Sequence, residues 1–187
     1  MAKAQTVGSL YGPILETVFN TAAGIKLLIC DIDGVFSDGR IYMGNQGEEL
    51  KAFHIRDGYG IKSLMNAGIE VAVITGRKSF IVEQRMSDLG IKHVYQGQDD
   101  KNTAFEDLID RLSIATKTIA YIGDDLTDWP VMSQVGLSVC VKDGHLVLAQ
   151  RADFITRTLG GYGAVREVCD LILEAREELN MNKRLNI

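Results

Sequence analysis

An alternation of short apolar strands with helical segments runs through most of the chain and constrains its fold more than any other feature. Strands are predicted at residues 25–30, 69–74, 92–95, 118–122, 137–141 and 153–156. Helices are predicted at residues 58–67, 78–89, 101–112, 126–134, 145–151 and 164–180. Strands that alternate with helices in this way form a parallel sheet with helices on both faces. The sequence therefore predicts a Rossmann-like, doubly wound α/β fold.

Two segments depart from this alternation. Residues 40–43 and 49–54 have the character of two strands joined by a Gly- and Asn-rich turn, which is typical of a β-hairpin. We expect this hairpin, at about residues 39–55, to form a small flap beside the end of the first strand. A further helix is predicted near residues 9–21. Because no repeat or proline-rich linker divides the 187 residues, we expect one domain, with a core at about 25–180 and a tail at 181–187.

Composition limits the classes of partner. Asp plus Glu number 25 against 20 for Lys plus Arg, so the formal net charge of −5 favours neither nucleic acid nor an anionic membrane surface. Cys30, Cys140 and Cys169 are far apart, as expected of reduced thiols in an intracellular protein. The N-terminal residues lack the apolar run of a signal peptide, and no apolar segment approaches the roughly 18 to 20 residues of a membrane helix. We expect a cytoplasmic protein.

The stretch LLICDIDGVFSDG places two carboxylates at the end of the first predicted strand. Alternate side chains of a strand point to the same face, so Asp31 and Asp33 are expected to crowd one small space. Such crowding is costly unless a cation or a shared proton relieves it. The pair is therefore a candidate functional site.

Three further polar motifs are expected at the same edge of the sheet. Thr75 and Arg77 follow a strand in the segment ITGR, Lys101 opens a helix, and the segment GDD ends with Asp124 and Asp125. In an open α/β sheet, ligands bind outside the carboxyl ends of the strands. Each motif alone is common in turns, loops and helix caps, and DDLTD could simply cap a helix, so the indication lies in the combination.

The chemistry that would use this combination is phosphoryl transfer through a covalent aspartyl phosphate. Asp31 would attack phosphorus, and Asp33 would protonate the leaving oxygen and later accept a proton from water. Thr75 would offer its hydroxyl and a backbone N–H at a helix start to the phosphate. Lys101 would offset the charge that develops on the phosphate oxygens.

An anionic nucleophile and a phosphate dianion also need a cation between them. Hard oxygen ligands without a His or Cys cluster favour Mg²⁺. We expect Asp31, Asp124 and the backbone carbonyl of Asp33 to hold it. Asp125 or Asp128 could hold a metal-bound water or orient another group.

The order of these motifs resembles the haloacid dehalogenase superfamily, matching DIDG at 31–34, ITG at 74–76, Lys101, and GDD at 123–125. The segments DGVFSDGRIY, GEELKAFHIRDGYGIK and YIGDDLTD further resemble a group of small members without a large cap domain. For this group the resemblance implies Mg²⁺-dependent hydrolysis of 3-deoxy-D-manno-octulosonate 8-phosphate in lipopolysaccharide synthesis. It also implies a homotetramer in which the hairpin and C-terminal tail of adjacent chains border each site. Lys183 and Arg184 are candidates in that tail.

The substrate implied by the resemblance carries a carboxylate besides its phosphate, so additional cationic side chains are expected. By physical reasoning Arg77 is the strongest of these, because it adjoins Thr75 at the mouth of the site. Other exposed basic residues could equally be solvated surface. The resemblance assigns substrate contacts to His54, Arg56, Asp57, Gly58, Lys62, Arg77 and Arg85. Asp33, Thr75, Gly76 and Lys101 are also expected to contact the substrate.

Three alternative functions share part of this pattern. A receiver-type signalling domain also places acids, a threonine and a lysine on an α/β sheet, but its phosphorylated Asp follows the third strand, where this chain has HVYQG. A non-catalytic assembly module of the same fold is disfavoured because the chain retains all five candidate site residues, Asp31, Asp33, Thr75, Lys101 and Asp124. A phosphatase for another sugar acid phosphate, such as a nine-carbon 9-phosphate, is the alternative nearest to the assignment.

Overall fold

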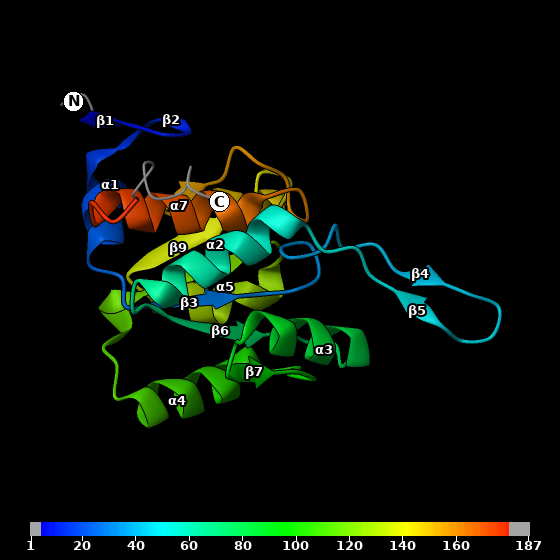
Figure 1. The fold of residues 1–187 in the computed structure, drawn as a ribbon. Helices are drawn as coiled ribbons and strands as arrows, with labels where there is room; N and C mark the ends of the chain where they lie inside the picture. Colours follow the sequence, from blue (N-terminus) through cyan, green and yellow to red (C-terminus); the bar gives the residue numbers. More distant parts are fainter. Residues whose placement is uncertain (1–4, 180–187) are drawn as a thin grey trace.

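A computed structural model describes residues 5–179, so the predicted roles of Lys183 and Arg184 concern residues outside this range (Figure 1). A six-stranded parallel sheet forms the centre, in the order β10-β9-β8-β3-β6-β7. Its strands are β3 (Leu27–Cys30), β6 (Glu70–Ile74), β7 (His93–Tyr95), β8 (Ile119–Gly123), β9 (Leu137–Cys140) and β10 (Phe154–Ile155). The predicted doubly wound α/β architecture is confirmed.

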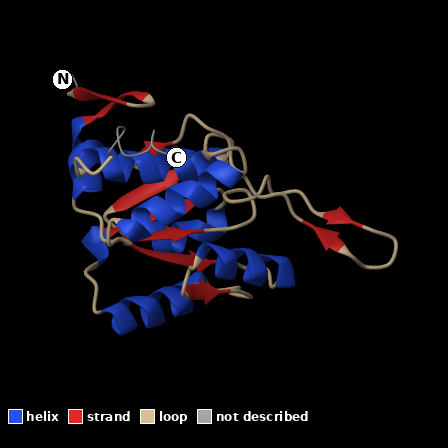
Figure 2. Ribbon diagram, in the orientation of Figure 1, coloured by secondary structure: helices blue, strands red, loops and turns tan. Residues whose placement is uncertain are grey.

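Helices cover both faces of the sheet (Figure 2). One face carries α1 (Glu16–Ala23), α2 (Ile55–Asn66), α3 (Phe80–Leu89) and α7 (Ala164–Ala175), and the other carries α4 (Lys101–Leu112), α5 (Trp129–Met132) and α6 (Leu146–Ala149). In β3, Leu28 and Cys30 pack toward the first group, whereas Leu27 and Ile29 pack toward the second. Each fully buried Leu or Ile contributes about 1.5–3 kcal/mol, so the end of β3 is firmly anchored.

A β-hairpin projects from the body on the side where the parallel strands end (Figure 1). Its strands, β4 (Tyr42–Met43) and β5 (Glu49–Leu50), pair antiparallel. They are shorter than the predicted strands at 40–43 and 49–54, because residues after β5 leave the ladder and His54 caps α2.

The predicted helix at residues 9–21 is wrong in its first half. Strands β1 (Thr6–Ser9) and β2 (Gly12–Leu15) form a second hairpin, and α1 begins only at Glu16. Gly12 has a φ of +109°, which a helix does not allow, and the following Pro13 disfavours a helical conformation at Gly12. The Tyr11 hydroxyl donates to Asp170 on α7 at 3.0 Å, which ties this hairpin to the body.

The last helix also ends earlier than predicted, at Ala175. Glu177 adopts a positive φ of 58°, so the chain turns away from the helical path there. Within residues 5–179, no helix combines the length and apolar character needed to cross a membrane.

Candidate active site

The end of β3 places the two predicted acids at one edge of the sheet. The Asp31 backbone N–H donates to the Ile122 carbonyl at 3.0 Å, which continues the pairing of β3 with β8 by one residue. The chain then turns sharply, since the Ile32 carbonyl accepts three N–H groups from residues 35–37. Gly34 allows this turn with a φ of +95°. Asp31 is consequently buried, whereas Asp33 is half-buried.

A pocket of about 260 Å³ opens at this edge, where the carboxyl ends of β3, β6 and β8 meet. It contains all four predicted catalytic residues and the predicted metal ligand Asp124. Three lining residues, Gln98, Asp99 and Thr127, were not predicted. The full lining comprises Asp31, Asp33, Thr75, Gly76, Arg77, Gln98, Asp99, Lys101, Asp124, Asp125 and Thr127.

Lys101 lies buried between two carboxylates at the start of α4. Its Nζ is 2.9 Å from Asp31 Oδ1 and 2.6 Å from Asp128 Oδ1. Burial alone would lower the pKa of Lys101, but the charges of Asp31 and Asp128 outweigh it and raise the pKa. Lys101 therefore stays an ammonium beside the nucleophile candidate.

Asp128 has a role that the sequence left open. Its Oδ1 accepts the Tyr121 hydroxyl at 2.7 Å in addition to Lys101, and its Oδ2 accepts the backbone N–H groups of Asp124 and Asp125 at 3.0 and 3.2 Å. Asp125 and Asp128 also form a capping box on the 3₁₀ turn Leu126–Asp128. The helix-cap interpretation of DDLTD thus holds for two of its acids, and Asp128 orients both Lys101 and the GDD loop.

Asp124, by contrast, extends toward β3. Its Oδ2 occupies the position that a Cβ on residue 34 would take, so only glycine there lets Asp124 approach the turn. Carboxylate oxygens of Asp31, Asp124 and Asp128 lie within 4.8 Å of one another. Because both oxygens of Asp128 already accept hydrogen bonds, Asp31 and Asp124 are the pair that can hold a cation.

The electrostatics of this pair fit a hard divalent cation. Burial, followed by the charge of Asp128, raises the pKa of Asp31 above its usual range. Burial, followed by the charge of Asp31, likewise raises the pKa of Asp124. Both carboxylates would gain from a cation between them, and an all-oxygen donor set suits Mg²⁺. The Asp33 backbone carbonyl as a third ligand stays a prediction.

Thr75 differs from its predicted role in one respect. Its backbone N–H donates to the Tyr95 carbonyl at 2.9 Å in a continuation of the β6–β7 pairing, so this N–H is not available to a phosphate. The helix that follows does not begin at Thr75 either, because Ser79 is the N-cap of α3. The hydroxyl remains as the phosphate donor, and Gly76 and Arg77 lie beside it in the pocket lining.

The projecting hairpin contributes two charged side chains that sequence reasoning missed. Lys51 Nζ contacts Asp33 Oδ1 and lies 3.6 Å from Glu49 Oε1. Arg77 donates to Glu49 Oε2 at 3.0 Å, and its Nε is 3.9 Å from Asp33 Oδ2. The available signal was the spacing of Glu49 and Lys51, because alternate residues leaving a strand point to one side.

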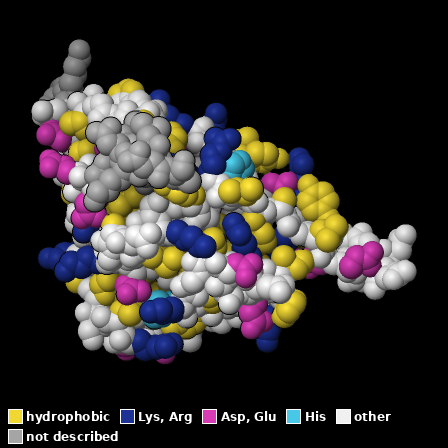
Figure 3. Space-filling view, viewed as in Figure 1, with side chains coloured by type: hydrophobic (Ala, Val, Ile, Leu, Met, Phe, Trp, Pro, Cys, Tyr) yellow, Lys and Arg dark blue, Asp and Glu magenta, His cyan; other side chains and the backbone are white. Residues whose placement is uncertain are grey.

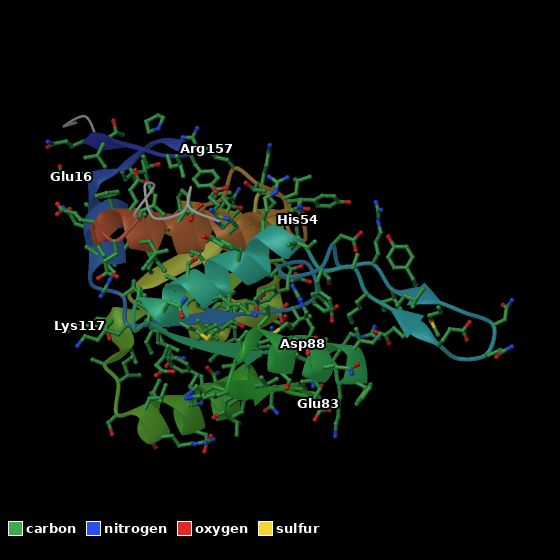
Figure 4. The ribbon with its side chains drawn as sticks, in the orientation of Figure 1. Glu16, His54, Glu83, Asp88, Lys117 and Arg157 are labelled. Atoms are coloured by element: carbon green, nitrogen blue, oxygen red, sulfur yellow. The ribbon has the colours of Figure 1, made fainter. Side chains whose placement is uncertain are left out.

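Several predicted substrate residues lie on α2 and do not line the pocket. His54 accepts the Arg56 backbone N–H on its Nδ1 at 3.1 Å and thereby caps the helix, at the end that faces the hairpin (Figure 4). Asp57 is 0% exposed and accepts the Arg166 backbone N–H at 2.8 Å, near the start of α7. Burial raises the pKa of Asp57 to about 6. Asp57 thus joins two helices.

The remaining predicted contacts are also outside the pocket lining. Lys62 is exposed on α2. The Arg85 guanidinium lies against Gly58 and 6.0 Å from the centre of the Phe53 ring. Contacts of the α2 residues and Arg85 with substrate stay predictions.

Comparisons with known proteins agree with this geometry. Residues 93–165 match the model of a haloacid dehalogenase-like hydrolase family. The chain is 55% identical over 187 residues to the 3-deoxy-D-manno-octulosonate 8-phosphate phosphatase KdsC of Yersinia pestis, and all of both chains is covered. The chain belongs to the haloacid dehalogenase-like hydrolases. The resemblance predicted from its four motifs is confirmed.

Two solved structures of haloacid dehalogenase-like phosphatases extend the comparison. The crystal structure of the Yersinia pestis phosphatase matches with a TM-score of 0.94 at 56% identity, covering 96% of this chain and 97% of the other. The phosphatase of Moraxella catarrhalis, in complex with a magnesium ion, a phosphate ion and KDO, matches with a TM-score of 0.86 at 43% identity. That match covers 90% of this chain and 97% of the other.

Proposed function

We propose that the chain hydrolyses 3-deoxy-D-manno-octulosonate 8-phosphate to the free sugar acid and inorganic phosphate, using Mg²⁺, in the cytoplasmic synthesis of lipopolysaccharide precursors. One observation carries the proposal: Asp31, Asp33, Thr75, Lys101 and Asp124 converge on one pocket in a chain that matches phosphatases of this substrate over its whole length. The Moraxella catarrhalis phosphatase binds a magnesium ion, phosphate and KDO on the same fold.

The reaction proceeds in two displacements on phosphorus. In the first, a carboxylate oxygen of Asp31 forms a bond to phosphorus as the bond from phosphorus to the sugar oxygen breaks. The electron pair of that bond stays on the sugar oxygen, which takes a proton from Asp33. In the second, water attacks phosphorus, Asp33 takes its proton, and the bond to Asp31 breaks to release phosphate. Both aspartates return to their starting states.

Charge balance explains the other residues of the pocket. Lys101 offsets the negative charge on the phosphate oxygens in both transition states, and its own pKa keeps it cationic. Asp31 and Asp124 would hold Mg²⁺, which would supply positive charge that neutralises the phosphate oxygens. The Thr75 hydroxyl can donate to a phosphate oxygen.

A panel of sugar phosphates tests this proposal. The enzyme is expected to prefer the eight-carbon 8-phosphate over a nine-carbon 9-phosphate by about tenfold or more in kcat/KM. Removal of divalent cations with EDTA is expected to abolish phosphate release, and added Mg²⁺ to restore it. A preference for the nine-carbon ester would contradict the substrate assignment, and no turnover of any ester would contradict the enzyme assignment.

We also propose a homotetramer in which adjacent subunits border each site. Within residues 5–179, the pocket is lined by residues at the sheet edge and by none from the hairpin. Apolar side chains are unusually exposed near that edge, with Met43 77%, Leu50 64%, Ile55 84% and Phe80 72% exposed. Figure 3 shows apolar atoms gathered at the base of the hairpin. Exposed apolar surface of this kind favours a protein interface.

Introducing charged residues on the hairpin tests the proposed homotetramer. The double variant Met43→Glu/Leu50→Glu is expected to convert the tetramer to smaller species, because burying two carboxylates in an apolar interface is costly. Light scattering coupled to gel filtration measures the mass, and kcat is expected to fall about tenfold or more because the shared walls are lost. Leu146→Glu, an equally exposed leucine on α6, is the matched control. A monomeric variant with unchanged kcat would argue against shared sites.

A further inference from the structure

Lys51 is a buried charge whose position the two displacements do not explain. Its side chain is 0% exposed, and its Nζ contacts Asp33 Oδ1. A lysine is almost never fully buried unless a carboxylate pairs with it, because desolvating the ammonium costs several kcal/mol. Lys51 follows β5 directly, so the ammonium reaches the acid–base residue from the hairpin and not from the sheet.

The two oxygens of Asp33 have different neighbours. Oδ1 contacts Lys51 and accepts the Ser37 hydroxyl at 3.4 Å. Oδ2 lies on the side of Arg77, 3.9 Å from its Nε, and Arg77 lines the pocket. Asp33 itself stands in the turn after β3, next to Gly34, where sheet pairing no longer fixes the backbone. The contacts at Oδ1 therefore decide where Oδ2 points.

We propose that Lys51 is a positioning residue for Asp33. The reaction begins with Asp33 as the neutral acid. The Lys51 ammonium fixes Oδ1, so that the proton is carried on Oδ2 and passes from there to the sugar oxygen as the phosphorus–oxygen bond breaks and the electron pair moves onto that oxygen. The same Oδ2 later takes the proton of the attacking water. The inference rests on the proposed phosphatase function and adds a residue of the hairpin to it.

Glu49 connects Lys51 to Arg77, which lines the pocket. Its Oε2 accepts from Arg77 at 3.0 Å, and its Oε1 is buried 3.6 Å from Lys51 Nζ. The hairpin stem thereby holds Lys51 and Arg77 on opposite sides of the Asp33 carboxylate. Misplacing a reacting group by about 1 Å can cost about 100-fold in rate, so this clamp is expected to matter for kcat more than for KM.

Leaving-group dependence in single-turnover experiments tests the inference. A sugar alkoxide needs the proton from Asp33 as it leaves, whereas p-nitrophenolate is stable without one. Lys51→Met is expected to slow sugar acid release about 10- to 100-fold with KM nearly unchanged. Release of p-nitrophenolate from p-nitrophenyl phosphate is expected to slow by less than about threefold.

A double-mutant cycle with Asp33→Asn gives a second readout. If Lys51 acts through Asp33, Lys51→Met is expected to add less than about threefold to the loss caused by Asp33→Asn. Lys117→Met, an exposed lysine at the opposite end of the molecule (Figure 4), is the matched control. Thermal unfolding checks the fold, and Lys51→Gln replaces Lys51→Met in the cycle if the latter does not fold.

Equal rate losses on the sugar ester and on p-nitrophenyl phosphate would overturn the role of Lys51, as would fully additive losses in the double-mutant cycle. An active wild-type enzyme would leave the proposed function standing in both cases. A wild-type enzyme that releases no phosphate from the sugar ester would instead overturn the proposed function, and this inference with it.

Discussion

Asp31→Asn is expected to lower kcat by about 10⁴-fold or more, a loss of about 5 kcal/mol in transition-state stabilisation. The asparagine amide has nearly the size of the carboxylate but is not a nucleophile toward phosphorus. Asp31 is buried, held by its backbone bond to Ile122 and paired with Lys101 at 2.9 Å. Four other carboxylates line the described part of the pocket: Asp33, Asp99, Asp124 and Asp125. Asp33 is engaged by Lys51, Asp125 caps the turn Leu126–Asp128, and Asp124 follows the neighbouring parallel strand β8.

Phosphate release under saturating substrate and Mg²⁺ measures this loss. The variant is expected to fold. Burial and the neighbouring Asp128 raise the pKa of Asp31, so a neutral side chain at this position removes an unfavourable buried charge. An unchanged melting temperature in the metal-free protein would verify this. Asp88→Asn, on α3, serves as the control for an aspartate outside the pocket (Figure 4). Activity of Asp31→Asn above about one hundredth of wild type would reject a covalent role for Asp31.

Lys101→Met is expected to have the second largest effect, on both rate and stability. Without the ammonium, Asp31 and Asp128 are two buried carboxylates with no cation between them. Removing one partner of a buried ion pair costs about 3–5 kcal/mol of unfolding free energy. In a chain of this size, that corresponds to a melting temperature lower by roughly 6–20 °C. The loss of charge stabilisation at the phosphate is expected to lower kcat about 100- to 1000-fold.

The two effects of Lys101→Met can be separated with Mg²⁺. Calorimetry with and without Mg²⁺ is expected to show partial recovery of the melting temperature, since a cation bound by Asp31 and Asp124 offsets part of the acid crowding. The kcat measured in the same Mg²⁺ buffer is expected to stay low. Lys92→Met, an exposed lysine, is the control. An unchanged melting temperature in the metal-free variant would contradict the bridging role of Lys101.

The sheet and its functional edge could be predicted because both depend on local patterns. Continuous apolar runs such as those of β6 and β8 are typical of parallel strands that are covered on both faces. Once the strands are parallel, their carboxyl ends must meet, which brings Asp31, Thr75 and Asp124 together without any knowledge of their contacts. Lys101 was found because it opens a helix at the same edge.

Other features depend on tertiary contacts that no local pattern reveals. The pairing of Lys51 with Asp33 requires the hairpin to fold back on the sheet edge, and the hydrogen bond from Lys101 to Asp128 joins residues 27 positions apart in the sequence. The backbone N–H of Thr75 was assigned to phosphate because its pairing with β7 could not be predicted. The prediction of a helix at residues 9–21 gave no weight to the Gly12–Pro13 pair, which is a turn signal.

Gly34 shows that a missing side chain can be as necessary to this enzyme as a reacting one. The Asp124 carboxylate fills the volume that a methyl group at residue 34 would need. A larger residue there would displace Asp124 from the end of β8 and separate it from Asp31, without altering any group that touches phosphorus. A sequence search for acids, bases and metal ligands would not identify Gly34. Gly34 nevertheless sets the distance between the DIDG and GDD motifs.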